Sequence, residues 1–182
     1  MKSILCILLF LCALNLTASP ITFEKVPEME ISIVQEQLIF FYSQELLKAG
    51  LFSDKASALQ GAKEEVLQEA IHTPLHLFYL SSADDGARCG YIAYSLKAET
   101  AYIESVYLDE KYRGLGLGKE TLSHLEEELQ ANGINMIKLY VFAHNQAAFN
   151  LYKKIGYNIE NGYFNNDIPI GYHMKKEMNP QS

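Results

Sequence analysis

The chain has 182 residues, of which 49% are hydrophobic and 20% are charged, and its formal net charge at pH 7 is −7. This length suits one domain with its own core and is too short for two domains of ordinary size. The composition excludes an intrinsically disordered chain, and the acidic balance argues against a nucleic-acid partner that is bound through bulk charge.

Residues 1–19 have the pattern of a signal peptide. Lys2 gives a short basic start, and residues 4–16 form an apolar run with a single polar interruption. The run is too short to span a bilayer comfortably and has the length of a signal-peptide core. We therefore predict cleavage and a periplasmic or secreted domain over 20–182, without stable membrane association. The alternative is an uncleaved segment, which would leave the protein cytoplasmic or membrane-anchored.

Cysteine usage is compatible with export but does not require it. Cys6 and Cys12 lie inside the predicted signal peptide, so cleavage would leave Cys89 alone. A lone cysteine cannot form an intramolecular disulfide. The domain therefore does not depend on an oxidising compartment.

The domain begins with a predicted strand and two predicted helices. Residues 21–26 could form the strand, and apolar residues at helical spacing predict the first helix over 31–49. Asp54 is a typical N-cap residue for the second helix, which extends to about residue 71 and ends before Pro74.

Three short runs rich in aromatic and β-branched residues follow, at 75–80, 89–96 and 100–108. Turn residues separate them, so they predict an antiparallel meander. A helix that starts near residue 118 and a strand at 136–142 come next. Because parallel strands need a crossover connection, the strands at either end of the 100–142 segment should be roughly parallel neighbours.

The last part of the chain predicts a helix over 145–155 and two strands at 157–160 and 170–176. An Asn/Gly-rich loop separates these two strands. The complete order is β-α-α-β-β-β-α-β-α-β-β. It predicts an α/β (α+β) single domain with a mixed sheet of six to seven strands flanked by about four helices.

The turn before the helix at residue 118 carries alternate glycines at 114, 116 and 118. Such a turn exposes backbone N–H groups at the positive end of the helix, which favours an anion such as phosphate. A tight connection without a ligand is the alternative. A P-loop would need a glycine where Arg113 stands. A dinucleotide fingerprint starting at Gly116 would need a small residue where Thr121 stands.

The pattern Arg-x-x-Gly-x-Gly over 113–118 resembles the coenzyme A pyrophosphate loop of the GCN5-related N-acetyltransferase (GNAT) superfamily. The stretches "YIESVYLDEKYRGLGLGKETLSHLEEEL" and "IKLYVFAHNQAAFNLYKKIGY" are similar to the consecutive A and B motifs of that family. The resemblance extends from about residue 75 to 178. It implies a GNAT-like fold and acetyl-CoA as the co-substrate, with no metal.

The resemblance also implies how the coenzyme is held. Main-chain groups of Val106, Tyr107 and Leu108 would pair with the pantetheine arm in a gap between two splayed strands. Arg113 would add positive charge beside the pyrophosphate, and the Asn145 side chain would meet the coenzyme. The N–H groups that would hold the pyrophosphate are those of Gly114, Leu115, Gly116, Leu117, Gly118 and Lys119.

Tyr152 is the strongest catalytic candidate. Its spacing with Ala148 and Ile155 turns it inward, and by spacing alone it is more simply a core tyrosine. The context "NxxAxxLYxxxGY" resembles that of the family tyrosine that protonates the departing thiolate. A main-chain N–H near Tyr107 or Leu108 would polarise the thioester carbonyl.

Glu104 is the candidate general base, because several family members carry a carboxylate on this strand. Strict alternation places Glu104 on one face with Tyr102 and Val106, and Ser105 on the other with Tyr107. Glu104 is a base if its face meets the acceptor. Otherwise it is an ordinary, partly exposed strand residue.

The histidines are weaker candidates. His144 beside the predicted coenzyme asparagine is more simply polar loop surface than a catalytic group. His72 and His76 lack partners at metal-ligand spacing, so we expect no zinc site.

The expected function is therefore transfer of an acetyl group from acetyl-CoA to a primary amine by direct attack. The acceptor would lie between the helical region 31–71 and the loop Asn161–Ile168, and a small amine, a peptide and a protein all remain open. The alternative is an exported binding or effector protein that keeps the fold and the coenzyme site with little or no turnover. Nothing in the sequence indicates an oligomeric state.

Overall fold

The computed structural model describes residues 20–178. The predicted signal peptide over 1–19 lies outside the described residues. None of the helices in the described range is both long and apolar enough to cross a membrane.

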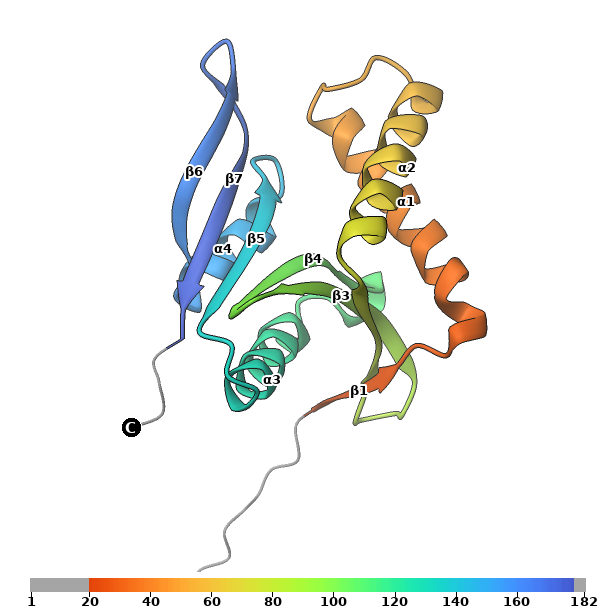
Figure 1. Ribbon diagram of the computed structural model, residues 1–182, viewed down its shortest axis with the longest axis vertical. Coiled ribbons are helices and arrows are strands. Elements are labelled where there is room, and N and C mark those ends of the chain that lie inside the picture. Colours follow the sequence, from red (N-terminus) through yellow and green to blue (C-terminus); the bar gives the residue numbers. More distant parts are fainter. Residues whose placement is uncertain (1–19, 179–182) are drawn as a thin grey trace, which may run out of the picture.

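The described chain forms a mixed sheet with helices on both of its faces (Figure 1). The strand order is β1-β2-β3-β4-β5-β7-β6. The strands are β1 (Ile21–Lys25), β2 (Leu75–Ser82), β3 (Arg88–Lys97), β4 (Thr100–Leu108), β5 (Met136–Phe142), β6 (Asn158–Asn165) and β7 (Ile168–Glu177). The helices are α1 (Ile31–Lys48), α2 (Lys55–His72), α3 (Leu117–Ala131) and α4 (Gln146–Lys154). The predicted chain order and fold class are confirmed.

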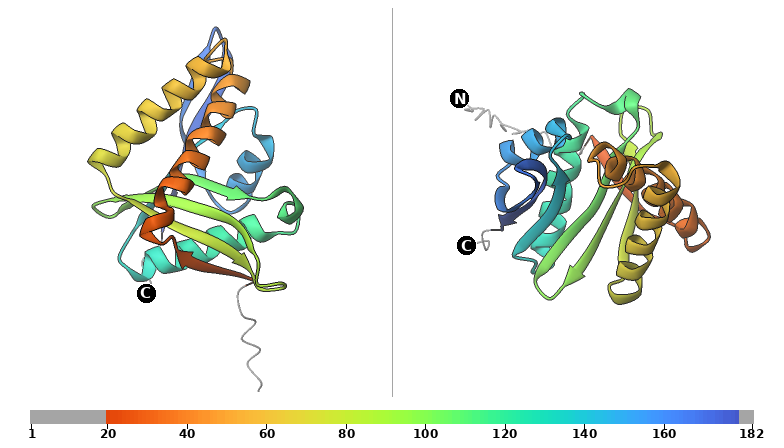
Figure 2. Two further views of the ribbon diagram at one scale, coloured as in Figure 1. Left: turned by 90° about the vertical axis from the view of Figure 1, so that its right-hand side faces the viewer. Right: turned by 90° about the horizontal axis from the view of Figure 1, so that it is seen from above.

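The two faces of the sheet carry separate cores, each covered by one pair of helices (Figure 2). On one face, α1 and α2 pack side by side over β2 and β3. On the other face, the leucine face of α3 and Tyr152 of α4 bury the central strands. The predicted N-cap of α2 is present and stabilises its first turn, because the Asp54 carboxylate accepts a hydrogen bond from the backbone N–H of Ser57 at 2.9 Å.

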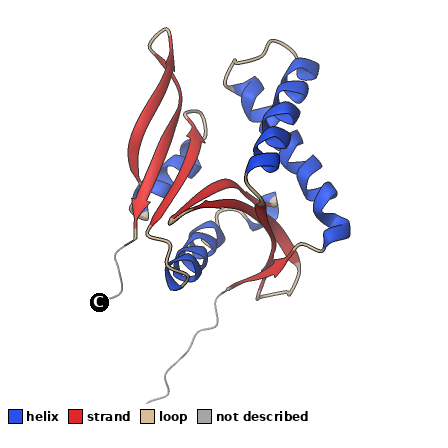
Figure 3. Cartoon of the chain, viewed as in Figure 1, coloured by secondary structure: helices blue, strands red, loops and turns tan. Residues whose placement is uncertain are grey.

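The strands β4 and β5 are parallel neighbours, as predicted, but they pair over a short length only. Their register runs from Thr100 and Met136 to Ile103 and Leu139. Beyond that point the two strands diverge, and Figure 3 shows the space that opens between them. The edge of β4 that faces β5 is therefore left without a strand partner after Ile103.

A β-bulge at Glu104 overturns the predicted alternation along β4. Ser105 pairs with Ala93 and Ile103 with Tyr94, so Glu104 is one residue more than β3 can match. Ile103 packs under α3 and α4, whereas Tyr107 packs under α1. Strict alternation would have put both on the same face. The extra residue shifts the pattern and leaves Glu104 exposed.

The prediction of an Asn/Gly-rich loop over 161–168 is wrong. Strand β6 continues to Asn165, and only Asn166 and Asp167 form the turn to β7. Both turn residues have positive φ, 47° and 66°, which is the conformation that two-residue hairpin turns require. The segment looked like a loop because β6 is an edge strand that is exposed along nearly all its length.

Candidate active site

A cleft of about 1620 Å³ lies between the helices α1 and α2 and the strands β4, β5 and β7. It brings together most of the predicted site residues, namely Glu104, Val106, Tyr107, Leu108, Arg113, Asn145 and Tyr152. The glycine turn is the exception. Leu115, Gly116 and Leu117 line a separate cavity of about 410 Å³ beside the start of α3.

The glycine turn has the geometry of an anion-binding helix start. Gly114 and Gly116 have φ of 75° and 87°, and a side-chain carbon at either position would meet no atom within 4 Å. Their main chain is therefore open to a ligand, and their conformation strongly disfavours a larger residue. Gly118 differs, because a side-chain carbon there would lie 3.3 Å from the side chain of Leu151 on α4, which would have to shift.

Only part of the predicted set of N–H donors is available at this turn. The N–H of Lys119 donates to the Gly116 carbonyl at 3.0 Å, so it already has a partner. The N–H groups of Leu117 and Gly118 stand at the start of α3, where the helix itself offers no acceptor. These two donors are the best placed for a phosphate.

Arg113 bonds to the end of β4 rather than extending away from the turn. Its Nε donates to the Leu108 carbonyl at 2.8 Å, and its guanidinium lies 5.6 Å from the centre of the Tyr107 ring. Both contacts fix the path of the turn relative to the strand. The guanidinium is therefore held at the end of β4.

Strand geometry divides the predicted pantetheine contacts on β4. The Asp109 N–H donates to Cys89 of β3, and every second residue of a strand points to the same edge. The main chain of Tyr107 is therefore directed toward β3, whereas that of Val106 and Leu108 is directed toward the gap beside β5. Tyr107 lines the cleft with its ring instead.

The Tyr107 ring joins the end of β4 to the helical wall of the cleft. It stacks on Phe41 of α1 with ring centres 4.3 Å apart, and on Tyr91 of β3 at 5.4 Å. Such stacking adds about 0.5–1.5 kcal/mol per pair to the burial of the rings. These contacts fix α1 against the end of β4.

Tyr152 is buried, as predicted, and it also lines the cleft. Its ring packs in the core under α4, 5.6 Å from the ring of Tyr157. Burial raises the pKa of Tyr152 to about 12. The hydroxyl therefore keeps its proton throughout the physiological pH range.

Glu104 lines the cleft, on the face of β4 opposite to the buried Ile103. Its carboxylate accepts a hydrogen bond from the hydroxyl of Ser95 on β3 at 2.7 Å. Ser95 is 5% exposed, and both residues line the cleft. The sequence could not have found Ser95, because its relation to Glu104 depends on the shifted strand register.

Asn145 caps α4, since its side-chain oxygen accepts the N–H of Ala148 at 3.2 Å. Its neighbour His144 is not merely loop surface. The His144 Nε2 lies 2.7 Å from a carboxylate oxygen of Glu45 on α1, a contact between residues 99 positions apart. Burial raises the pKa of Glu45, but hydrogen bonds from Lys48 and His144 outweigh it and leave that pKa below its usual range.

No group of three or more His, Cys, Asp or Glu side chains in the described chain could hold a metal ion. Cys89 is a free thiol that is fully buried and donates to the Leu80 carbonyl at 3.3 Å. Burial raises the pKa of this thiol, with a smaller contribution from Asp109. Cys89 is therefore a poor nucleophile.

Comparisons with known proteins agree with this geometry. A sequence model of the acetyltransferase (GNAT) family matches residues 43–157. The chain is 29% identical over 146 residues to YdgE of Bacillus subtilis, an uncharacterized N-acetyltransferase, covering 77% of this chain and 93% of the relative. It is 29% identical over 101 residues to the spermidine N(1)-acetyltransferase of Thermoplasma acidophilum, covering 54% of this chain and 63% of the relative.

Solved structures share the fold. The structure of the acetyltransferase YycN from Bacillus subtilis superposes with a TM-score of 0.71 at 27% identity, covering 80% of this chain and 96% of the other. The PaiA N-acetyltransferase of Thermoplasma acidophilum, solved in complex with coenzyme A, gives a TM-score of 0.61 at 21% identity, covering 86% and 98%.

Proposed function

The chain belongs to the acetyltransferase (GNAT) family, and from that premise we propose that it acetylates a primary amine by direct attack in a ternary complex. It is an acetyl-CoA-dependent acyltransferase, and its acceptor is an amine. The observation that carries the proposal is a single cleft lined by the unpaired edge of β4, Tyr152 and Glu104.

The co-substrate fits the gap between β4 and β5. The main-chain groups of Val106 face this gap and can pair with the amides of the pantetheine arm, whereas the Leu108 carbonyl already accepts a hydrogen bond from Arg113. The open main chain at Gly114 and Gly116 and the free N–H groups of Leu117 and Gly118 suit the pyrophosphate. Asn145, at the start of α4, lines the same cleft.

The residues then have the following roles. The neutral amine attacks the thioester carbon, which forms the carbon–nitrogen bond, and the carbon–sulfur bond breaks. Glu104 takes the proton that the amine loses, and Tyr152 gives its proton to the departing thiolate. The excess proton on Glu104 returns to Tyr152 through solvent, so the enzyme is restored. The N–H of Leu108 stabilises the negative charge on the carbonyl oxygen.

Positioning supplies most of the rate enhancement in this account. With a pKa of about 12, Tyr152 is a weak acid for a thiolate whose conjugate acid has a pKa near ~8.5. Its contribution depends on being held next to the sulfur, and it should be modest. Alignment of the amine with the thioester in one cleft accounts for the larger share.

Direct attack is favoured over an acetylated enzyme. A covalent route needs a reactive nucleophile in the cleft, and Cys89 of β3, the cysteine of the described chain, is fully buried in the core. A thiol without solvent access and with a raised pKa does not accept an acetyl group readily.

The proposed reaction does not define which class of amine is the acceptor. One relative carries the name spermidine N(1)-acetyltransferase, which supports a small amine as acceptor. Membership of an enzyme family does not favour the alternative of a binding protein without turnover. If the segment over 1–19 is a signal peptide, the acceptor would be met outside the cytoplasm.

Initial rates measured against both substrates test the mechanism. Direct attack predicts intersecting double-reciprocal lines when acetyl-CoA and the amine are varied together, and no acetylated protein in acid-quenched samples by mass spectrometry. Parallel lines together with a stoichiometric acetyl adduct on the protein would overturn the ternary complex.

A further inference from the structure

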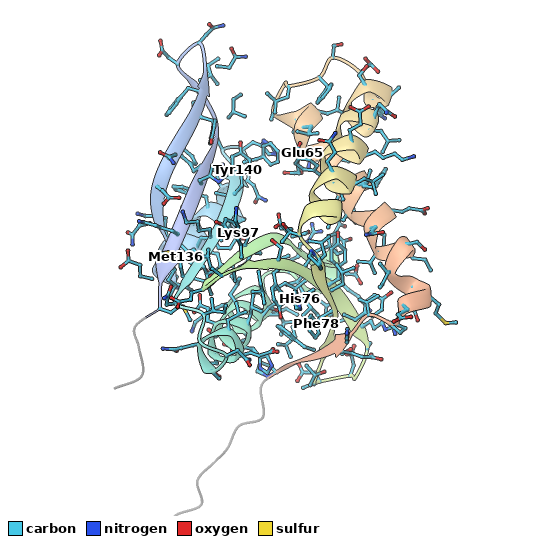
Figure 4. All side chains as sticks on the ribbon, viewed as in Figure 1. Glu65, His76, Phe78, Lys97, Met136 and Tyr140 are labelled. Carbon is cyan, nitrogen blue, oxygen red and sulfur yellow. The ribbon has the colours of Figure 1, made fainter. Side chains whose placement is uncertain are left out.

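Glu65 and Tyr140 lie on opposite walls of the cleft (Figure 4). Glu65 belongs to α2 on the helical wall, and Tyr140 belongs to β5 on the strand wall. The mechanism above uses neither of them. Their chemistry indicates what kind of acceptor the cleft receives.

The Glu65 carboxylate is oriented by its neighbour on α1. The hydroxyl of Tyr42 donates to Glu65 at 2.8 Å, which ties the two helices together at the cleft. Among residues 20–178, no lysine, arginine or histidine forms an ion pair with Glu65. A fixed carboxylate without a cationic partner creates a site of negative potential on this wall.

The opposite wall is aromatic. The Tyr140 ring lies 5.1 Å from the His173 ring and 6.0 Å from the Tyr163 ring, and the latter two are 5.1 Å apart. The phenol end of Tyr140 lies against Gly171, where a side-chain carbon would collide with its hydroxyl. Three rings from β5, β6 and β7 thus form one aromatic surface.

The field of Glu65 reaches this surface. Burial raises the pKa of Tyr140, and the nearby Tyr163 and Glu65 raise it further. A positive charge placed between the walls would therefore be attracted by the carboxylate on one side. The ring faces on the other side attract cations as well.

Most other cations at the cleft are engaged elsewhere. Lys48 bonds to Glu45, and Lys138 bonds to both carboxylate oxygens of Glu160. Arg113 is bonded at the coenzyme end. Lys97 lies at the end of β3 rather than on the helical wall.

We propose that Glu65, oriented by Tyr42 and facing the Tyr140 wall, binds a second positively charged group of the acceptor. The substrate class is then a diamine or polyamine, with one neutral amine at Glu104 and a distal ammonium at Glu65. This inference rests on the proposed acetyl transfer to an amine in the same cleft.

Calorimetric titration of the full chain in the presence of coenzyme A tests the site directly. The probes are α,ω-diaminobutane and butylamine, which share a carbon chain and differ in the second amine. We expect diaminobutane to bind more tightly, and Glu65→Gln to weaken its binding about tenfold without changing that of butylamine. Tyr42→Phe should produce a smaller loss in the same direction.

Glu64→Gln is the matched control, because Glu64 is exposed on the same helix and bonds to Gln60 outside the cleft. It should change neither affinity. Equal affinity for the two probes, or an equal effect of Glu65→Gln on both, would overturn the distal site.

A parallel assay of thiol release from acetyl-CoA keeps the two proposals separate. Release with butylamine and no Glu65 dependence would retain acetyl transfer and reject the distal site. Selective diaminobutane binding without release by either amine would retain the site and reject the proposed reaction.

Discussion

The hydroxyl of Ser95 donates to the Glu104 carboxylate at 2.7 Å, across the point where β4 carries one residue more than β3. The bond links a buried serine to an exposed carboxylate and holds the carboxylate over the floor of the cleft. The bulge therefore does more than interrupt the pairing of β4 with β3. It lets the consecutive residues Glu104 and Ser105 both line the cleft in which the acceptor would bind.

Replacement of Glu104 tests its role as the base. Glu104→Gln keeps the shape of the side chain and removes the proton acceptor, so kcat/KM should fall about a hundredfold. The decline of kcat/KM at low pH should also flatten in the pH–rate profile. Ser95→Ala should cause a smaller loss of kcat/KM, because it removes only the bond that positions the carboxylate. Glu104→Asp, whose carboxylate is one carbon shorter, should not retain the wild-type kcat/KM. Glu127→Gln, exposed on α3, is the control. An unchanged pH–rate profile in Glu104→Gln would assign Glu104 to the surface.

Tyr152→Phe separates catalysis from binding. Loss of the hydroxyl should lower kcat about tenfold or more while the Kd for acetyl-CoA stays within about twofold. Because the pKa of Tyr152 is about 12, the ratio of wild-type to variant kcat should be constant between pH 6 and 10. Tyr157→Phe removes a neighbouring buried hydroxyl that does not line the cleft, and it should leave kcat unchanged. A large loss of acetyl-CoA affinity in Tyr152→Phe would make Tyr152 chiefly structural.

The glycine turn can be tested with two glycines in the same conformation. Gly116 and Gly133 have φ of 87° and 81°, and alanine at either position meets no crowding. Gly116→Ala and Gly133→Ala should therefore cost similar stability, about 1 kcal/mol each. Only Gly116→Ala should weaken acetyl-CoA binding, by about tenfold, as measured by calorimetry. Equal affinities in the two variants would remove the turn from the coenzyme site.

The hydrogen bonds of Glu45 with Lys48 and His144 predict a pH dependence of stability. The folded-state pKa of Glu45 lies below its ordinary value of 4.5, so the ionised form is favoured by folding. Its contribution is present above pH 4.5 and is lost as the pH falls through the lower, folded-state value. The Tm difference between wild type and Glu45→Gln should be largest near neutral pH and shrink below pH 4.5. Glu36→Gln, exposed on the same helix, should show no such trend. A Tm difference that grows on acidification would contradict this assignment.

The elements were predictable because their signals are local. Strands at 100–108 and 136–142 were bounded by turn residues and have the predicted limits. The parallel placement of β4 and β5 followed from the crossover helix between them. Tyr152 was turned inward by helical spacing alone, and it is buried.

The features that were missed depend on pairing between distant segments. Alternation along β4 is a property of one strand, whereas the bulge at Glu104 is set by the register with β3. The polar strand β6 carries no buried face to mark it, so its asparagines and glycine indicated a loop. The contact of His144 with Glu45 joins positions 99 residues apart, which no local pattern encodes.

Amine-dependent release of thiol from acetyl-CoA by the full chain is the decisive test of acetyl transfer in this cleft. We predict that thiol appears only when a primary amine is present, with one acetylated amine formed for each thiol released. Failure to bind acetyl-CoA, or thiol release at the same rate with and without an amine, would contradict acetyl transfer at this cleft.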